Sequence, residues 1–427
     1  MNKTIRVANL ARVEGEGALK LKIKDGRVTE AKFSIFEAPR FFEGFLRGRR
    51  GDEAPDLTAR ICGICPVAYQ MSSTHALEGI LGLSVDGQLR ELRRLLYCGE
   101  WIESHALHVY FLHAPDFLGY SSAIALAQDY PEIVKEGLAL KKAGNDLVAL
   151  LGGREIHPVN VRVGGFYRTP RVQELRALAD QLQAALKIAL KTVRWVAGFD
   201  FPDAAADYEF VALRHPEEYP LCQGRLVSSR GLDISAFEYE DHFAEEHVRH
   251  STALQSHRIG AGRYLVGPMA RFNLNFDRLT PLAQAVAREV GLTPDCRNPF
   301  QSIIVRSVEL VFACEEALRI IQSYERPDRP CLTAPWRAGR GCAISEAPRG
   351  SLYHRYTLDE QGVILNARLV PPTSQNQKSV EDDLSRVAEA NLHLDDDRLT
   401  LILEQAIRNY DPCISCSTHC LHFQIER

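Results

Sequence analysis

Apolar and charged residues alternate through residues 4–36, on both sides of Asp25-Gly26. A period of two is typical of a strand with one buried face, and Asp-Gly favours a tight turn between two such strands. We therefore predict a β-hairpin near the N-terminus. A second alternating segment, SLYHRYTLDEQGVILNARLVPP, predicts another hairpin inside a strand-rich stretch at about 342–371.

Between these two stretches the apolar spacing is mostly helical. Leucine and isoleucine recur at helical intervals from about 86 to 113, and residues 172–197 give the clearest pattern, with Pro170 before it and Gly198 near its end. Further helices are predicted at about 133–151, 278–290, 301–325, 378–392 and 397–409. The segment 201–240 is irregular and rich in Pro, Tyr and acidic residues, so we interpret it as a surface excursion.

The predicted fold class is α+β and mainly helical, with small antiparallel sheets near the N-terminus and around 342–371. We find no internal repeat and no flexible linker, so we expect one domain over residues 1–427. Within it we distinguish a β-rich part at 1–60, a mainly helical body at 61–340 and a C-terminal part at 341–419. A short tail follows at 420–427.

Composition narrows the class of protein only a little. Hydrophobic residues make up 45% of the 427 residues and charged residues 25%, as in ordinary globular proteins. The formal net charge of -4 gives no bulk attraction to nucleic acid or to an anionic membrane. No apolar run is long enough to span a membrane, and the N-terminus lacks the apolar core of a signal peptide. We expect a cytoplasmic protein.

Cysteine carries the first chemical signal. Of eleven cysteines, seven are scattered and four form two Cys-x-x-Cys pairs, Cys62/Cys65 and Cys413/Cys416. The spacing lets both thiolates of a pair face one metal, so two pairs offer four soft ligands. Spacing alone leaves open a structural zinc site, a redox or catalytic metal, or unrelated pairs. The wide separation weighs against zinc, because a chain this long needs no metal to build a core.

At these residues the sequence resembles the large subunit of nickel–iron hydrogenases. That family has an R-x-C-G-x-C motif near its N-terminus and a D-P-C-x-x-C-x-x-H motif near its C-terminus, and both are present at the expected ends. Further segments agree in order and spacing over nearly the whole chain: R-x-E-G at 12–15, an acidic segment at 40–43, E-x-P-R-G at 346–350, and VPPTSQN at 370–376.

The resemblance implies the hydrogenase large-subunit fold and an oxidoreductase that cleaves molecular hydrogen reversibly into protons and electrons. It implies that all four cysteines ligate nickel. Cys65 and Cys416 would also bridge to iron, whereas Cys62 and Cys413 would be terminal ligands on nickel. The iron would carry one carbon monoxide and two cyanides.

Other matched positions receive roles from the same resemblance. Arg349 would lie over the open metal position, with Pro348 and Thr373 lining the pocket for the diatomic ligands. Glu43 and His419 would hold a magnesium ion or another hard cation.

Heterolysis of hydrogen also needs a base for the proton. The terminal thiolate of Cys413 or the guanidine of Arg349 could be the first acceptor, although arginine ordinarily stays charged. The resemblance implies that Glu14 takes the proton onward from the thiolate.

Three features depart from the family pattern. Tyr69 stands where members often have histidine, four residues after the second cysteine, and its hydroxyl could still donate a hydrogen bond to a bridging sulfur. Ser104 replaces an acid between two histidines of many respiratory members, and we expect His105 and His108 to be packed or hydrogen-bonded rather than to bind metal. The residues CLHFQIER follow His419, where family precursors are commonly cut by a maturation endopeptidase.

The remaining cysteines show no iron–sulfur spacing, and no P-loop or dinucleotide-binding glycine motif occurs. Electrons must then leave through another chain, and the resemblance implies an iron–sulfur small subunit in a hetero-oligomer. The chain looks most similar to the cytoplasmic NAD(P)-linked, sulfhydrogenase-type branch, whose diaphorase subunits carry FAD and an iron–sulfur protein. The cluster Arg47-Gly48-Arg49-Arg50 could face a partner or form a solvated loop.

Competing functions remain at this point. One is a non-catalytic hydrogen sensor on the same scaffold, and another is a structural zinc protein with four cysteine ligands. A hydrogenase-like quinone-reductase subunit is disfavoured, since that lineage typically loses the four cysteines.

Overall fold

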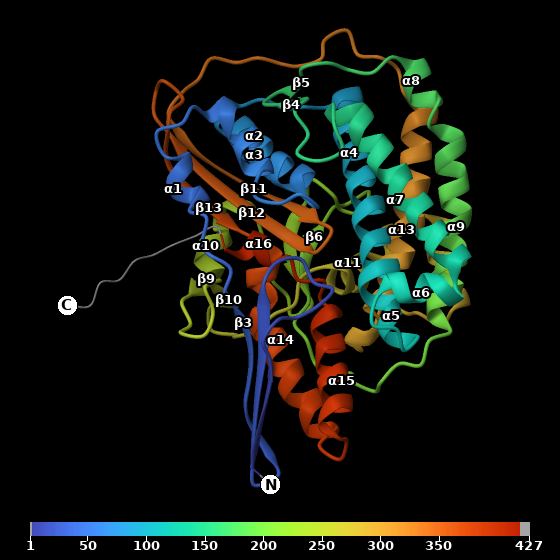
Figure 1. Ribbon diagram of the computed structural model, residues 1–427. Helices are drawn as coiled ribbons and strands as arrows, with labels where there is room; N and C mark the ends of the chain where they lie inside the picture. Colours follow the sequence, from blue (N-terminus) through green and yellow to red (C-terminus); the bar gives the residue numbers. More distant parts are fainter. Residues whose placement is uncertain (1, 419–427) are drawn as a thin grey trace, which may run out of the picture.

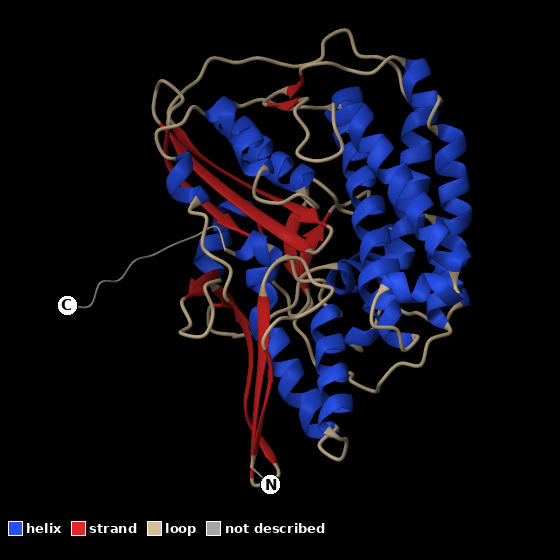
Figure 2. Ribbon diagram, viewed as in Figure 1, coloured by secondary structure: helices blue, strands red, loops and turns tan. Residues whose placement is uncertain are grey.

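The computed structural model describes residues 2–418. Figure 1 shows long helices gathered on one side, the sheet of β11, β12 and β13 beside them, and a long hairpin that projects from the body. Figure 2 shows that helices dominate and that the strands form several small, separate sheets. The mainly helical α+β prediction is therefore confirmed.

The helical side is built from four long helices: α4 (Gly87–Ala106), α7 (Pro131–Gly152), α9 (Ala179–Ala197) and α13 (Ser302–Ser323). α7 packs along α4, while α13 contacts both α4 and α9. Two glycines permit the close approach of α4 and α7. A Cβ on Gly144 would lie 2.6 Å from the amide nitrogen of Glu103, and one on Gly99 would lie 2.9 Å from Val148.

Two predicted helices are interrupted. The helix expected over 86–113 continues from α4 as a π-helical segment, Leu107–His113, before α5 (Ala114–Phe117). The helix expected over 172–197 divides into α8 (Val172–Arg176) and α9. At this division the amide of Leu178 bonds to the carbonyl of Leu175 at 3.0 Å, a tighter 3₁₀-type turn.

Both predicted hairpins are confirmed. β2 (Gly17–Lys24) and β3 (Arg27–Ile35) pair across Asp25-Gly26, and β1 (Lys3–Val7) joins β2 to give the order β1-β2-β3. β12 (Gly350–Leu358) lies between β11 (Gly339–Ala347) and β13 (Ile364–Val370), all antiparallel. β3 runs along α14 (Pro372–Ala390), which starts six residues before the predicted helix.

The helices that flank the first cysteine pair were not predicted. They are α1 (Phe42–Leu46), α2 (Ala54–Ala59) and α3 (Pro66–Leu81), so strands end at Ile35 within the part expected to be β-rich. α3 is buried on nearly every side, between α2 and the sheet of β11 and β12. A helix without a solvated face shows no amphipathic period, which is why the sequence concealed it.

The interpretation of 201–240 as a surface excursion is wrong. This segment forms the sheet β6 (Val211–Arg214), β7 (Arg225–Ser228) and β8 (Asp233–Ile234). Its apolar residues form a second buried cluster with Tyr264, Tyr353 and Val370. Tyr219 is fully buried and donates a hydrogen bond of 2.7 Å to Glu309 of α13. Short strands with polar turns lack the long periodicity that would have identified them.

The remaining elements complete the chain. The short helices are α6 (Ala123–Asp129), α10 (Tyr239–His242), α11 (Pro268–Asn275), α12 (Pro281–Glu289), α15 (Asp396–Arg408), α16 (Ile414–Ser417), and 3₁₀ turns at Gly51–Glu53, Ala236–Glu238, Phe276–Arg278 and Pro299–Gln301. Two-stranded sheets join β4 (Val161–Arg162) to β5 (Gly165–Phe166) and β9 (Phe243–Glu246) to β10 (Gln255–Arg258). Within residues 2–418, no helix is long and apolar enough to cross a membrane.

A buried charge network ties the helices to the central sheet. Arg271 of α11 donates two hydrogen bonds of 2.8 Å to Glu309 of α13 and one of 3.1 Å to Glu346 of β11. Its guanidinium also stacks over Trp101 of α4, 4.3 Å from the ring centroid. Burial opposes the charge of Glu309, yet Arg271 and His105 lower its pKa to about 2. Breaking such a buried pair typically costs about 3–5 kcal/mol.

The glycine contact between α4 and α7 gives a stability prediction. Gly144→Ala should lower the free energy of unfolding by about 1–3 kcal/mol, because its Cβ would overlap the backbone of α4. Gly79→Ala is the matched control, since its Cβ meets open space on α3 and should stabilise the helix by about 0.5–1 kcal/mol. Urea denaturation measures both. Equal effects would show that the contact is not tight.

Candidate metal centre

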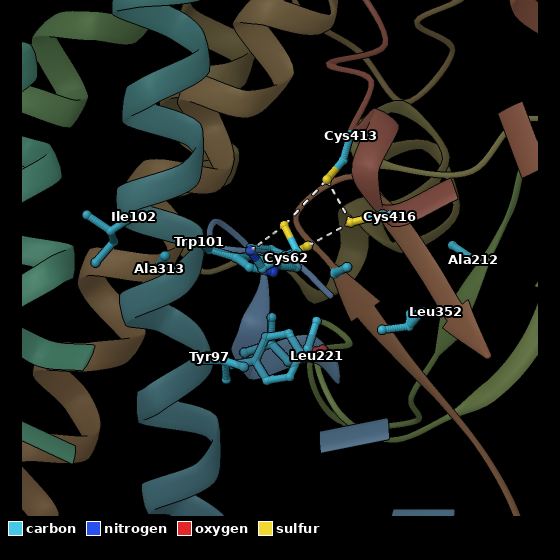
Figure 3. Close-up of a cluster of buried hydrophobic side chains, with 14 of the residues drawn as sticks. Cys62, Tyr97, Trp101, Ile102, Ala212, Leu221, Ala313, Leu352, Cys413 and Cys416 are labelled. Carbon is cyan, nitrogen blue, oxygen red and sulfur yellow. Dashed lines mark hydrogen bonds between the residues drawn. The ribbon is translucent and has the colours of Figure 1, made fainter. Parts of the chain in front are cut away.

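The four paired cysteines meet in one buried cluster. Cys65 caps the N-terminus of α3, and Cys413 caps α16, which contains Cys416. The Sγ atoms of Cys62 and Cys413 are 3.4 Å apart, those of Cys65 and Cys416 are 3.6 Å apart, and all four lie within 4.8 Å of one another. Figure 3 shows the sulfurs converging beside α4. The structure thus unites two pairs that the sequence places at opposite ends.

Residues near the N-terminus hold the two cysteine loops together. The amide of Ile414 donates to the carbonyl of Glu14 at 3.0 Å, and residues 14 and 413 form a parallel bridge. The guanidinium of Arg40 donates to the carbonyl of Ile61 at 2.7 Å and also to the carbonyl of Ser415. Arg40 therefore clamps the loop before the first pair to the loop within the second pair. This role was not predicted.

The carboxylate of Glu14 lies beside the second cysteine pair. One oxygen accepts the backbone N–H of Ser415 at 3.0 Å, and the other accepts the hydroxyl of the same residue. Glu14 is half-buried, and neighbouring Glu37 has a pKa raised by burial and by the charge of Glu14. A half-buried carboxylate fixed next to the thiols can exchange a proton with both the cluster and the solvent side.

Arg349 is buried beside the cluster and is oriented by Asp411. Its Nε donates to the carbonyl of Asp411 at 2.7 Å and its Nη2 to the carboxylate at 3.0 Å. Burial opposes its charge, but Asp411 and the cysteine sulfurs raise the pKa of Arg349 well above its usual value. The hydroxyl of Thr373 accepts the N–H of Cys413 at 3.0 Å, and the carbonyl of Pro348 accepts a bond from Arg271. Each of these expected residues thus has a defined structural contact.

Asp411 belongs to the motif of the second cysteine pair, but no role was predicted for it. It directly precedes Pro412 and has a backbone φ of 50°, a left-handed conformation that non-glycine residues adopt at an energetic cost. That conformation presents both its carbonyl and its carboxylate to Arg349. The motif marks Asp411 in the sequence, but its pairing with Arg349, 62 residues away, is visible only in the structure.

The cluster fits a soft metal cation. Burial and the adjacent sulfurs raise the pKa of Cys413 well above its usual value, and burial also raises that of Cys416. Thiols this crowded can all be deprotonated only if a cation offsets their charge. Two buried polar atoms have no partner in the described part of the chain: Nη1 of Arg349 and one carboxylate oxygen of Asp411. A polar ligand bound here could therefore accept a hydrogen bond from Arg349 or donate one to Asp411.

Glu43 lies on α1, with 8% of its surface exposed. One carboxylate oxygen accepts the N–H of Leu369 at 2.8 Å. Burial raises the pKa of nearby Glu245 to about 7, with Arg368 opposing this and Glu43 adding to it. His419, expected to share a cation with Glu43, lies outside the described residues, as does the tail at 420–427.

The departures from the family pattern have distinct surroundings. Tyr69 and Ser104 are both buried, and the hydroxyl of Ser104 has no hydrogen-bond partner among residues 2–418. His105 pairs with Glu309 at 2.9 Å, whereas His108 bonds to the carbonyl of Arg408 at 2.7 Å. The two imidazoles therefore serve different neighbours, as expected for structural rather than metal-binding histidines.

Two buried acids on α4 were also missed. Glu100 accepts the N–H groups of Val67 and Ala68 at 2.6 and 3.2 Å, so it caps the start of α3. Glu103 lies one turn on, 3.3 Å from Lys141, and burial raises its pKa to about 7. The apolar spacing of α4 identified the helix, but it could not show that two of its acids point inward.

Six of the scattered cysteines lie within the described residues, as free thiols. Cys98, Cys296 and Cys314 are buried, while Cys222, Cys331 and Cys342 are partly exposed. Cys420 lies outside the described residues. The four-cysteine cluster is the one group of three or more potential ligands close enough to share a metal within the described chain. Arg47, Gly48, Arg49 and Arg50 are exposed.

Comparison with known proteins agrees with this geometry. The nickel-dependent hydrogenase family matches residues 40–136 and 266–419. Sulfhydrogenase 1 subunit alpha of Pyrococcus furiosus is 32% identical over 97% of each chain, and NAD-reducing hydrogenase HoxS subunit beta of Cupriavidus necator is 27% identical over 99% of this chain and 96% of its own.

Solved structures give the same result. An NAD+-reducing NiFe hydrogenase in the H2-reduced state aligns with a TM-score of 0.88 and 26% identity over 98% of this chain and 99% of its own. The Ni-Fe-Se hydrogenase of D. vulgaris Hildenborough aligns with a TM-score of 0.77 and 21% identity over 98% of this chain and 100% of its own, a likeness of fold alone.

The Arg40 clamp gives a prediction about metal loading. Arg40→Met removes the two hydrogen bonds that join the cysteine loops, so metal affinity should fall by about 10–100-fold. Arg47→Met is the control, since Arg47 is exposed nearby. Nickel and iron content of the purified variants measures the effect. Equal loading of the two variants would show that the clamp is dispensable.

Proposed function

The chain belongs to the nickel-dependent hydrogenase family as a large subunit, and on that premise we propose that it is the catalytic subunit that cleaves molecular hydrogen reversibly into protons and electrons. The observation that carries the proposal is the convergence of four buried cysteine sulfurs beside Arg349. A structural zinc site would need no buried arginine, and no carboxylate poised beside its ligands.

We assign a nickel–iron centre to the four cysteines. Cys62 and Cys413 are proposed as terminal ligands of nickel, and Cys65 and Cys416 as bridges to an iron that carries one carbon monoxide and two cyanides. When bound, this centre supplies the redox chemistry that splits hydrogen and takes up its electrons. The unpartnered Nη1 of Arg349 supports a place beside the diatomic ligands, with Pro348 and Thr373 lining that pocket.

Proton transfer is assigned to Cys413 and Glu14. The high pKa of Arg349 keeps its guanidinium charged, which favours the thiolate of Cys413 over the guanidine as first acceptor. From Cys413 the proton passes to Glu14, whose oxygens are fixed on Ser415 between the two cysteines of the second pair. A carboxylate held this way can relay protons without moving its backbone.

A hard cation behind the centre is part of the same proposal. Magnesium prefers carboxylate oxygen, and Glu43 offers a buried carboxylate whose charge also raises the pKa of Glu245. A divalent cation would relieve the repulsion between these two acids. The contribution of His419 stays a prediction.

Electrons are proposed to leave through an iron–sulfur small subunit at the surface over Gly63. Cys62 is buried but the next residue, Gly63, is exposed, so the cluster lies directly beneath this face. Ile156 and Val159 are exposed apolar residues, at 53% and 44%, on the loop between α7 and β4, and a Cβ on Gly63 would lie 3.9 Å from Ile156. Ile156→Asp should abolish copurification with the small subunit; retained copurification would place the interface elsewhere.

The electron acceptor and the maturation of the chain remain proposals. NAD(P) is favoured because relatives over nearly the full length include an NAD-reducing enzyme, and diaphorase subunits with FAD and an iron–sulfur protein would complete that assembly. A maturation endopeptidase is proposed to remove 420–427. The single-domain organisation over 1–427 and the cytoplasmic location also stay predictions.

The function is tested on protein matured and purified with its partners. We expect about one nickel per large subunit, infrared bands of bound carbon monoxide and cyanide, and hydrogen-dependent reduction of viologen. Zinc in place of nickel and iron would overturn the proposal. An assembled centre without turnover would indicate a hydrogen sensor instead.

Glu14→Gln tests the proton route. The amide cannot carry the proton, so we expect full metal content but loss of activity and of H2/D2 exchange into solvent, by at least about 100-fold, the usual contribution of a positioned acid–base group. Glu16→Gln, an exposed neighbour two residues on, should leave both measurements unchanged. Unchanged exchange in Glu14→Gln would show that the proton leaves by another route.

A further inference from the structure

The sheet of β1, β2 and β3 carries an excess of positive charge that the proposed metal centre does not use. Its strands contain one acidic residue, Glu30, against seven basic ones: Lys3, Arg6, Lys20, Lys22, Lys24, Arg27 and Lys32. The whole chain, in contrast, has a formal net charge of -4. Positive charge is therefore concentrated on this sheet.

The strand register places most of these cations on one face. The apolar residues that alternate with them, such as Ile5, Leu19, Leu21 and Phe33, are buried on the other face. Figure 1 shows the sheet projecting from the body beside α14, which packs against β3. One face of the sheet thus belongs to the core, and the opposite, basic face is directed toward solvent.

Three cations stand abreast across the basic face. Arg6 on β1 is directly opposite Lys20 on β2, and Lys20 is directly opposite Lys32 on β3. Side chains directly opposite each other in antiparallel strands have Cβ atoms about 5 Å apart, so like charges at such positions repel and destabilise the sheet. The row of Arg6, Lys20 and Lys32 is therefore unfavourable for the fold.

The single acid of the sheet is already shared among the lysines. The carboxylate of Glu30 is 2.8 Å from Nζ of Lys20, 2.6 Å from that of Lys22 and 3.7 Å from that of Lys32. Hydrogen bonds from Lys20 and Lys22 lower the pKa of Glu30 to about 2, so this one negative charge is always present. It cannot offset three lysines together with Arg6. Local arrangements that oppose stability in this way occur typically at functional sites.

We propose that the basic face of β1, β2 and β3, through the row Arg6, Lys20 and Lys32, binds an acidic segment of a partner protein. Carboxylates from the partner would supply the negative charge that the sheet itself lacks. The inference is independent of the proposed nickel–iron centre, because none of these residues contacts the cysteine cluster.

The spacing of the cations fits an extended peptide. Alternate residues of a strand share a face and are about 7 Å apart, so Lys20, Lys22 and Lys24 form a ladder along β2. An extended acidic segment laid along this strand presents every second carboxylate at the same interval. Each carboxylate can then meet one lysine of the ladder.

Two other partners fit the face less well. Proteins that lie on a membrane surface insert large apolar side chains, whereas those of residues 3–35 are buried or partly buried. Nucleic acid would be repelled by the net negative charge of the chain as a whole.

Binding of a fluorescent peptide with glutamate at alternate positions to the full chain tests the proposal. The natural chain should bind the peptide, and salt should weaken the binding because it screens exposed charges. Replacing the row by Arg6→Gln, Lys20→Gln and Lys32→Gln together should weaken binding by at least about tenfold, the effect of losing three exposed ion pairs. No binding to the natural chain would overturn the proposal.

The control variant removes three exposed cations from other surfaces, in Lys135→Gln, Lys142→Gln and Arg398→Gln together. It should bind the peptide as the natural chain does. Equal weakening in the two triple variants, or none in the row variant, would show that the row does not recognise acidic segments.

Two further measurements guard against a change of fold in the row variant. Relief of the repulsion should leave its urea midpoint unchanged or higher, and a lower midpoint would show that the row serves the fold instead. On the natural chain, carbodiimide joins lysine amines to peptide carboxylates in contact with them, and mass spectrometry should find the links at Lys20, Lys22 and Lys32. Links concentrated on other lysines would overturn the proposal, as would tighter binding of phosphatidylserine vesicles or single-stranded DNA to this face.

Discussion

The structure depends on bringing two cysteine loops together in a buried site. Cys62 and Cys413 are 351 residues apart in the sequence, yet their sulfurs are in contact. Burial favours neutral thiols, whereas metal binding requires thiolates. Only a cation that binds all four sulfurs reconciles these demands. The metal is therefore part of what makes the site stable, and the rest of the chain serves to hold the two loops in register around it.

Arginine side chains provide that register. Arg40 joins the two loops through their carbonyl oxygens, and Arg349 is fixed by both the backbone and the carboxylate of Asp411. Farther out, Arg271 connects helices α11 and α13 to strand β11. Each arginine bonds to segments distant in the chain. At Arg349 and Arg271, losing the carboxylate partner would leave an unpaired buried charge. Position is thus set by paired charges, and the apolar core fills the space between them.

The elements that the sequence predicted correctly are mostly those in which the pattern of apolar and polar residues reflects one buried and one solvated face. The hairpin at Asp25-Gly26 has a turn signal and helix α9 has a solvated face, so both were identified. Helix α3 and the strands of 201–240 were missed or misinterpreted because elements buried on several sides lack this apolar–polar pattern. At the site, the cysteines and Glu14, Arg349 and Thr373 were identified through motifs. Arg40, Glu100 and the role of Asp411 depend on which distant carbonyl, amide or guanidinium each one meets, and spacing along the chain does not encode this.

The long separation between the cysteine pairs also has a kinetic consequence. Contacts between residues far apart in sequence form late in folding, because a large loop must close first. The Cys62/Cys65 pair therefore waits for its partners while α3 and the helical body are already forming. If Cys62 and Cys65 oxidised to each other before the loops met, both would be lost as thiolate ligands.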